Sequence, residues 1–143
     1  MSQRAQDEPT GPSSASPTSP LTGLAVLIVE DDADSCELLA MVVEEQGAMV
    51  RTAGDATAAL DALGEHPFHV VVSDIGLPGQ DGIWLVGEAR RRSFTLPFIA
   101  LSAYADTLAS ARALEAGFVL YLVKPIDPAH VIAAVLQHSV RDV

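Results

Sequence analysis

The sequence contains few positively charged residues. It has 8 lysine and arginine residues against 19 aspartate and glutamate residues, a formal net charge of −11. Proteins that bind DNA or RNA directly usually present a basic face to the phosphate backbone. This balance therefore argues against direct nucleic-acid binding. The one basic cluster, Arg90 to Arg92, lies where a helix is predicted to end, and positive charge there complements the helix dipole.

Cysteine and long apolar runs are also scarce. Cys36 is the only cysteine, so no disulfide can form within the chain, which is consistent with a cytoplasmic protein. No apolar run approaches the roughly 20 residues of a membrane span, and no secretory signal pattern is present. We therefore expect no membrane insertion. Cys36 lies among apolar residues with helical spacing and is predicted to be a buried small hydrophobe.

The first twenty residues differ in composition from the rest. They hold four of the nine prolines and almost no large apolar side chain. Such a segment cannot bury enough surface to offset the entropy of ordering it. We predict a disordered Pro/Ser-rich tail or linker at 1–20. The remainder, 21–143, is predicted to be one globular domain, since 49% of the sequence is hydrophobic.

From residue 24 onward, five short apolar runs alternate with stretches of helical spacing. Strict alternation of this kind predicts an α/β fold, a parallel sheet with helices on both faces. Gly64 and Gly117 are predicted to stop the second and fourth helices, and Asp127 and Pro128 to begin the last. We expect strands at 24–29, 49–52, 70–73, 97–101 and 119–123. The first helix should end near residue 47, the next three should span 55–63, 82–91 and 106–115, and the last should begin at 127.

Polar side chains follow four of these strands. Glu30 and Asp31 follow the first strand, and Asp74 follows the third. Ser102 follows the fourth strand, and Lys124, the only lysine, follows the fifth. In an open parallel sheet, ligands bind in the crevice outside the carboxyl ends of the strands. Acids, a hydroxyl and an ammonium group that meet there would suit a divalent cation beside a phosphorylated carboxylate.

The chemistry of these groups is compatible with phosphoryl transfer. Mg²⁺ is usually held by one or two carboxylates plus a phosphate, and carboxylates packed together are tolerated when a cation lies among them. Asp74 could act as a nucleophile and form an acyl phosphate, with Lys124 as its counter-charge. Taken singly, each residue also has a structural explanation. The acids after the first strand could complement a helix dipole, Asp74 and Ser102 could be turn or capping residues, and Lys124 could be a surface lysine.

Four segments in order make the pattern specific. The segments 26–32, 71–82, 100–103 and 121–125 resemble the receiver domains of bacterial two-component signalling in motif and in spacing. The resemblance implies a five-stranded, flavodoxin-like doubly wound (βα)5 fold with strand order 2-1-3-4-5. It leaves open whether the receiver is free-standing or belongs to a hybrid histidine kinase.

The resemblance also implies roles for individual residues. Asp74 would accept a phosphoryl group from a histidine kinase or a histidine phosphotransfer protein. The cofactor would be Mg²⁺, held by Glu30, Asp31, Asp74 and the backbone carbonyl of Gly76. Ser102 and Lys124 would contact the phosphoryl group, Ser102 and Tyr121 would form the switch, and the Lys124–Pro125 bond would be cis. Glu30 stands where Asp is more frequent, and Ser102 where Thr is commoner, yet both keep the group that the mechanism needs.

We therefore expect a phosphoacceptor that signals by conformational change to an unknown downstream protein, and no enzyme activity beyond its own phosphorylation and dephosphorylation. Residues 119–123 are expected at the sheet edge, where they and the two flanking helices could form a homodimer or partner surface. Three alternatives stay open. One is an adaptor that works without phosphorylation. Another is a Mg²⁺-dependent phosphohydrolase of the haloacid-dehalogenase type, although Gly76 stands where that family needs a second Asp. The third is a flavin binder, whose phosphate the acids at 30–32 would repel.

Overall fold

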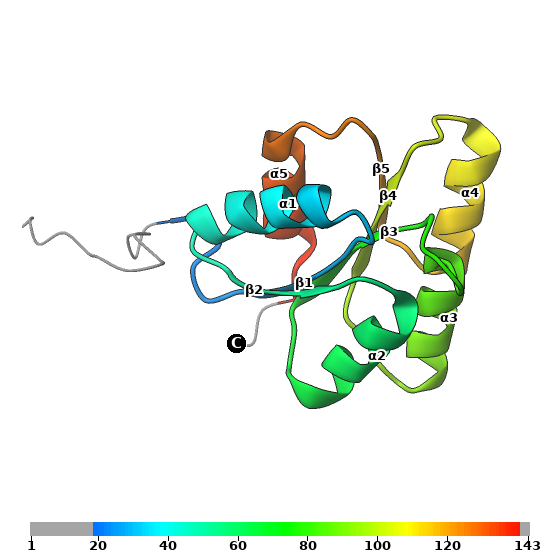
Figure 1. The fold of residues 1–143 in the computed structure, drawn as a ribbon, viewed down its shortest axis with the longest axis horizontal. Helices are drawn as coiled ribbons and strands as arrows, with labels where there is room; N and C mark the ends of the chain where they lie inside the picture. Colours follow the sequence, from blue (N-terminus) through cyan, green and yellow to red (C-terminus); the bar gives the residue numbers. More distant parts are fainter. Residues whose placement is uncertain (1–18, 141–143) are drawn as a thin grey trace, which may run out of the picture.

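The structure, a computed structural model, describes residues 19–140. Five strands form one parallel sheet in the order β2-β1-β3-β4-β5, and a helix follows each strand (Figure 1). The predicted flavodoxin-like α/β fold and its strand order are thus confirmed. Most of the predicted tail, residues 1–18, lies outside the described residues. The elements are β1 (Ala25–Val29), α1 (Ala33–Glu45), β2 (Met49–Ala53), α2 (Ala56–Glu65), β3 (Val70–Asp74), α3 (Gly82–Arg91), β4 (Phe98–Ser102), α4 (Thr107–Ala116), β5 (Leu120–Val123) and α5 (Pro128–His138).

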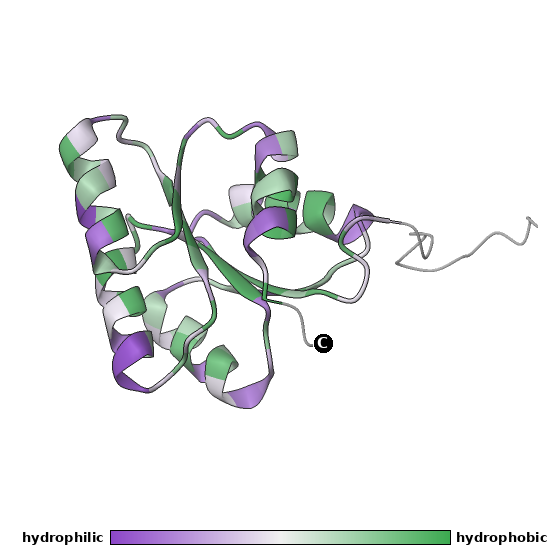
Figure 2. Ribbon diagram, turned by 180° about the vertical axis from the view of Figure 1, so that it is seen from behind, coloured by the Kyte–Doolittle hydropathy of each residue, from purple (hydrophilic) through white to green (hydrophobic). Residues whose placement is uncertain are grey.

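The helices cover both faces of the sheet, as the alternating pattern predicts. α1 and α5 lie on one face, and α2, α3 and α4 lie on the other (Figure 1). Because side chains of a strand alternate between faces, Leu27 and Val29 pack with the second group of helices, and Val26 and Ile28 pack with the first. The strands are mostly hydrophobic, whereas each helix also carries hydrophilic residues (Figure 2). Two apolar layers therefore enclose the sheet.

The central strands are more buried than the outer ones. β3 and β4 are buried along their whole length, while β5 has no fully buried residue. β2 and β5 form the two edges of the sheet. The expectation that residues 119–123 lie at an edge is thus confirmed.

Each helix begins with an aspartate cap. A side-chain oxygen of this aspartate accepts a hydrogen bond from a backbone N–H in the first turn, which stabilises a helix start. Asp32 in this way caps α1, whereas Glu30 and Asp31 precede the cap. Asp32 is therefore the acid of this run that caps the helix directly. The five caps are Asp32, Asp55, Asp81, Asp106 and Asp127.

Most of the predicted boundaries hold within one or two residues, and Gly117 ends α4 with a φ of 128°. Gly64 was predicted to stop α2, and this prediction is wrong. The helix continues to Glu65, because the N–H of His66 still donates to the carbonyl of Ala62, and Pro67 then prevents a further turn.

Cys36 is half-buried rather than buried, because the face of α1 on which it lies turns toward the edge strand β2. Among residues 19–140, no helix combines the length and the apolar character that crossing a bilayer requires.

Candidate functional site

The strand ends bring three carboxylates together. Val29 of β1 pairs with Ser73 of β3, so that Glu30 and Asp74 leave neighbouring strands at the same edge of the sheet. Glu30 and Asp74 are buried, whereas Asp31 is exposed. Each of the three offers an oxygen, and these oxygens lie within 4.8 Å of one another. Two of these carboxylates are therefore held close together away from solvent, where an opposite charge stabilises their ionised forms.

Lys124 supplies that positive charge in this structure. Its Nζ lies 2.8 Å from Oδ2 of Asp74 and 3.0 Å from Oε1 of Glu30. The side chain comes from the end of β5, where the Lys124 N–H donates to the Ser102 carbonyl at 2.7 Å. The Lys124–Pro125 bond is cis, as predicted.

The pKa values of buried Glu30 and half-buried Lys124 reflect this arrangement. Burial is the main reason why the pKa of Glu30 lies above its usual range, and the charge of Asp74 adds to the effect. Hydrogen bonds from Lys124 and from the Asp32 N–H oppose it. Burial acts to lower the pKa of Lys124, but the hydrogen bonds to Asp74 and Glu30 outweigh it and raise this pKa overall. The ammonium form of Lys124 is thus favoured next to the acids.

The Asp74 carboxylate is held at both oxygens. Oδ2 accepts from Lys124, and Oδ1 accepts from the backbone N–H of Gly76 at 3.2 Å. The remaining Glu30 oxygen, Oε2, accepts from the Asp32 N–H, also at 3.2 Å. The carboxylates are therefore oriented by donors on three different loops.

Two residues, Gly82 and Ser73, contact the backbone at Asp74 and Ile75, and the sequence did not reveal this role. A Cβ on Gly82 would lie 2.6 Å from the Asp74 carbonyl oxygen and 2.8 Å from the Ile75 Cα, so only glycine allows α3 to start this close. The Gly82 N–H donates to the Ile75 carbonyl at 2.8 Å. The buried hydroxyl of Ser73 donates to the Asp74 carbonyl at 2.9 Å. In the sequence, the position of Gly82 directly after a capping aspartate could have indicated its role. No sequence feature indicated the role of Ser73.

Ser102 and Tyr121 are linked through a third residue. The buried Ser102 hydroxyl accepts from the N–H of Tyr104 at 3.1 Å. The Tyr121 hydroxyl donates to the carbonyl of the same Tyr104 at 2.5 Å. The predicted switch pair is therefore connected by the backbone of Tyr104, which no sequence pattern singled out.

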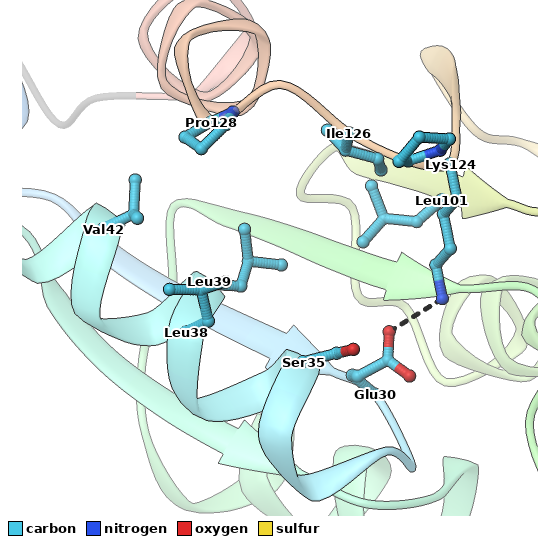
Figure 3. A pocket seen from close by; sticks show the side chains of 10 residues that line it. Glu30, Ser35, Leu38, Leu39, Val42, Leu101, Lys124, Ile126 and Pro128 are labelled. Carbon is cyan, nitrogen blue, oxygen red and sulfur yellow. Dashed lines mark hydrogen bonds and ion pairs between the residues drawn. The ribbon is translucent and has the colours of Figure 1, made fainter.

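A cavity of about 280 Å³ opens beside Glu30 (Figure 3). Leu38 and Val42 of α1 form one wall, and they are faced by Ile126 of the β5–α5 connection and by Pro128, the first residue of α5. Glu30 and the Lys124 ammonium meet at one end of it, joined by their hydrogen bond (Figure 3). The charged site is therefore bordered by an apolar groove on the side of α1 and α5.

The donor set fits Mg²⁺. Glu30, Asp31 and Asp74 offer carboxylate oxygens, the ligands that this ion prefers, and the group contains no histidine or cysteine. The same geometry bears on two of the alternatives. Gly76 occupies the place where a haloacid-dehalogenase-type phosphohydrolase needs a second aspartate. The loop after β1 presents Glu30 and Asp31, which would repel the phosphate of a flavin.

Comparison with known proteins agrees with this geometry. The response regulator receiver domain profile matches residues 26–136. An uncharacterized 14.6 kDa protein of Leptolyngbya boryana is 40% identical over 120 residues, which cover 82% of this chain and 92% of that protein. The response regulator protein FleR of Pseudomonas aeruginosa is 34% identical over 114 residues, 80% of this chain but 24% of FleR, so this chain spans about a quarter of that relative. Among solved structures, the receiver domain of the Francisella response regulator 1452 matches with a TM-score of 0.76 at 30% identity, covering 79% of this chain and 93% of that one.

Proposed function

The chain belongs to the response regulator receiver domain family, and on that premise we propose that it is a phosphoacceptor whose acceptor group is Asp74. Receiver domains are the signalling modules of two-component systems. The phosphoryl donor would be a phosphohistidine on a histidine kinase or a histidine phosphotransfer protein. The conformational change that follows would carry the signal to a downstream protein.

The transfer uses groups that the site already holds. An oxygen of the Asp74 carboxylate attacks the phosphorus, the P–N bond of the phosphohistidine breaks, and the imidazole leaves with the electron pair. Glu30, Asp31, Asp74 and the Gly76 carbonyl would hold Mg²⁺. When bound, this ion neutralises charge on the phosphoryl oxygens.

Lys124 and Ser102 are placed to receive the new group. The Lys124 ammonium already contacts Asp74 and would move its hydrogen bond to a phosphoryl oxygen. The Ser102 hydroxyl would turn away from Tyr104 and donate to a second phosphoryl oxygen. Both movements break contacts that are present in this structure, and the movement of Ser102 would couple phosphorylation to the loop that carries Tyr104.

One observation carries the proposal. A single ammonium group bridges two buried carboxylates from neighbouring strands, at the strand ends where ligands bind in this fold. An adaptor that works without phosphorylation would have no need to keep this costly arrangement of charges away from water.

The test is intact-mass measurement after incubation with acetyl phosphate and Mg²⁺. We expect one added phosphoryl group on the wild type and none on Asp74→Asn or in excess chelator. Asp81→Asn, which removes an exposed capping carboxylate near the same loop, should still be labelled. Undiminished labelling of Asp74→Asn would refute the assignment, and an unlabelled wild type would favour the adaptor.

The output surface is expected on α4, β5 and α5. Leu108 of α4 is 63% exposed, Val119 before β5 is 42% exposed and Leu136 of α5 is 47% exposed. These side chains give an apolar component to a surface bordering the loop that phosphorylation would move. We assign this surface to a downstream protein or to a second copy of the chain.

A further inference from the structure

Arg90, at the C-terminal end of α3, joins two loops that are distant in the sequence. One terminal nitrogen donates to the carbonyls of Phe94 and Leu96, at 2.9 Å each, and the other donates to the Gly117 carbonyl at 3.4 Å. The guanidinium carbon also lies 5.3 Å from the centre of the Phe98 ring. The three hydrogen-bond acceptors of Arg90 are all backbone carbonyls. Arg90 therefore ties the connection before β4 to the connection after α4, a role beyond the dipole complement expected from the sequence.

The C-terminal end of α4 is firmly packed at this point. Gly117 has a φ of 128°, and a Cβ there would lie 3.4 Å from a methyl carbon of Val86. The next ring, Phe118, is buried and meets Phe98 edge to face at 6.1 Å. Ala113, one turn earlier, is completely buried. This end of the helix is thus fixed against α3 and β4.

The N-terminal end of α4 is held differently. The chain is exposed from Ala103 to Leu108, and Tyr104 ties this stretch to the sheet. Its N–H donates to Ser102 of β4, and its carbonyl accepts from Tyr121 of β5. Both contacts involve the switch residues. The contacts that fix this end of the helix would therefore change when Ser102 responds to a phosphoryl group on Asp74.

We propose that Arg90 makes the C-terminal end of α4 a pivot, so that release of Tyr104 lets the helix swing about Gly117. The trigger rests on the proposed function, because Ser102 would leave Tyr104 to meet a phosphoryl group on Asp74. The ten residues of α4 form a lever of about 15 Å at 1.5 Å per residue. Arg90 is in this sense a positioning residue. It directs the motion to the first turn, where Leu108 is exposed.

The pivot can be tested without phosphorylation, by amide hydrogen exchange followed by NMR. The amides of Ala109 and Ser110, bonded to Asp106, report on the first turn. Those of Gly117 and Phe118, bonded within the last turn, report on the other end. Tyr121→Phe removes one hydrogen bond to Tyr104. We expect exchange in the first turn to become about twofold to tenfold faster, the range that one hydrogen bond contributes, with the last turn unchanged.

Arg90→Met should have the opposite pattern, with faster exchange at Gly117 and Phe118. Arg92→Met, which alters an exposed arginine at the same helix end, is the matched control and should change neither. The amide of Val72 in β3 reports global unfolding, and each change is counted relative to it. Equal acceleration at both ends in Tyr121→Phe, or unchanged exchange at Gly117 and Phe118 in Arg90→Met, would overturn the pivot.

Beryllofluoride with Mg²⁺, an acyl-phosphate mimic, tests the trigger separately. In the wild type it should alter exchange at Ala109 and Ser110 but not at Gly117 and Phe118. In Arg90→Met the change should extend to all four amides. If beryllofluoride does not bind, the proposed phosphoacceptor function fails, and the two substitutions still decide whether the pivot exists. If it binds and moves both ends of α4 in the wild type, the function stands and the pivot is wrong.

Discussion

The ammonium group of Lys124 lies 2.8 Å from a carboxylate oxygen of Asp74, although the two residues are 50 positions apart in the sequence. The same group reaches Glu30 at 3.0 Å. The protein thus places its own cation between carboxylates that would otherwise repel one another. A metal ion bound at these acids has to compete with that contact.

Replacement of Lys124 should therefore tighten Mg²⁺ binding. Lys124→Met removes the competing charge, and we expect the dissociation constant for Mg²⁺ to fall by about tenfold, or about 1.4 kcal/mol. Isothermal titration calorimetry measures the constant directly. Phosphorylation by acetyl phosphate should be slower in the same variant, because the counter-charge of the phosphoryl group is lost. Lys124→Arg, which keeps the charge, should bind Mg²⁺ within about threefold of the wild type. Weaker Mg²⁺ binding by Lys124→Met would contradict the competition.

Gly82→Ala should destabilise the fold and displace Asp74. The new Cβ would meet the Asp74 carbonyl at 2.6 Å, so the start of α3 would have to move, at a cost of about 1–3 kcal/mol. Gly87→Ala lies in the same helix with no atom within 4 Å of its new Cβ, and should stabilise the helix by about 0.5–1 kcal/mol. Urea unfolding followed by the fluorescence of Trp84, the only tryptophan, measures both. If both variants shift the unfolding free energy in the same direction, the close packing of Gly82 against the Asp74 carbonyl does not determine the stability of the fold.

The convergence of Glu30, Asp74 and Lys124 could be predicted because a parallel sheet brings all strand ends to one edge, whatever the details of packing. The position of β5 at the edge of the sheet followed from the family resemblance. These features depend on element order and residue type, which the sequence displays directly.

Other features depend on contacts that no local pattern encodes. Tyr104 acts through its backbone N–H and carbonyl, so its side chain gave no indication of the link between Ser102 and Tyr121. Arg90 matched a simple dipole explanation, yet its partner Gly117 lies 27 residues away. At Gly64 the local pattern is misleading, because a glycine near a helix end predicts a stop although α2 continues past it to Glu65.

Acid should remove a stabilising contribution from Glu88. Hydrogen bonds from Arg91 and Arg92 lower the pKa of Glu88 from 4.5 to about 2. Because the folded state holds this carboxyl ionised more strongly than the unfolded state, the contribution is present above pH 4.5 and is lost as the pH falls toward 2. Unfolding free energies at pH 5 should favour the wild type over Glu88→Gln, and the difference should shrink by pH 3. Because Arg91 and Arg92 are exposed, 1 M salt should also reduce the difference in unfolding free energy between the wild type and Glu88→Gln. A difference that is constant between pH 5 and pH 2 would contradict this origin.

Ser93→Gly should stabilise the domain by about 1 kcal/mol. Ser93 follows α3 with a φ of 72°, a left-handed conformation that costs a residue with a side chain about 1–2 kcal/mol and glycine little. Its N–H donates to Arg90 and the N–H of Phe94 donates to Ala89, the hydrogen bonds of a Schellman motif, in which glycine is preferred at this position. Thermal unfolding should show a higher midpoint for Ser93→Gly and no gain for Ser93→Ala. Equal midpoints for the two variants would mean that the backbone conformation at 93 carries no strain.

Self-association, if it is part of the output, should depend on Val119. This side chain is 42% exposed beside β5, at the open edge of the sheet, and a carboxylate there would have to be desolvated in any apolar interface. Sedimentation velocity with beryllofluoride and Mg²⁺ should show dimers of the wild type at concentrations where Val119→Glu stays monomeric. Met49→Glu is the control, since Met49 is 76% exposed on β2, at the opposite edge. It should dimerise like the wild type. A dimer that tolerates Val119→Glu but not Met49→Glu would move the interface to the β2 edge. A wild type that stays monomeric in both states would leave the surface of α4, β5 and α5 to a downstream protein, which Val119→Glu should then fail to bind.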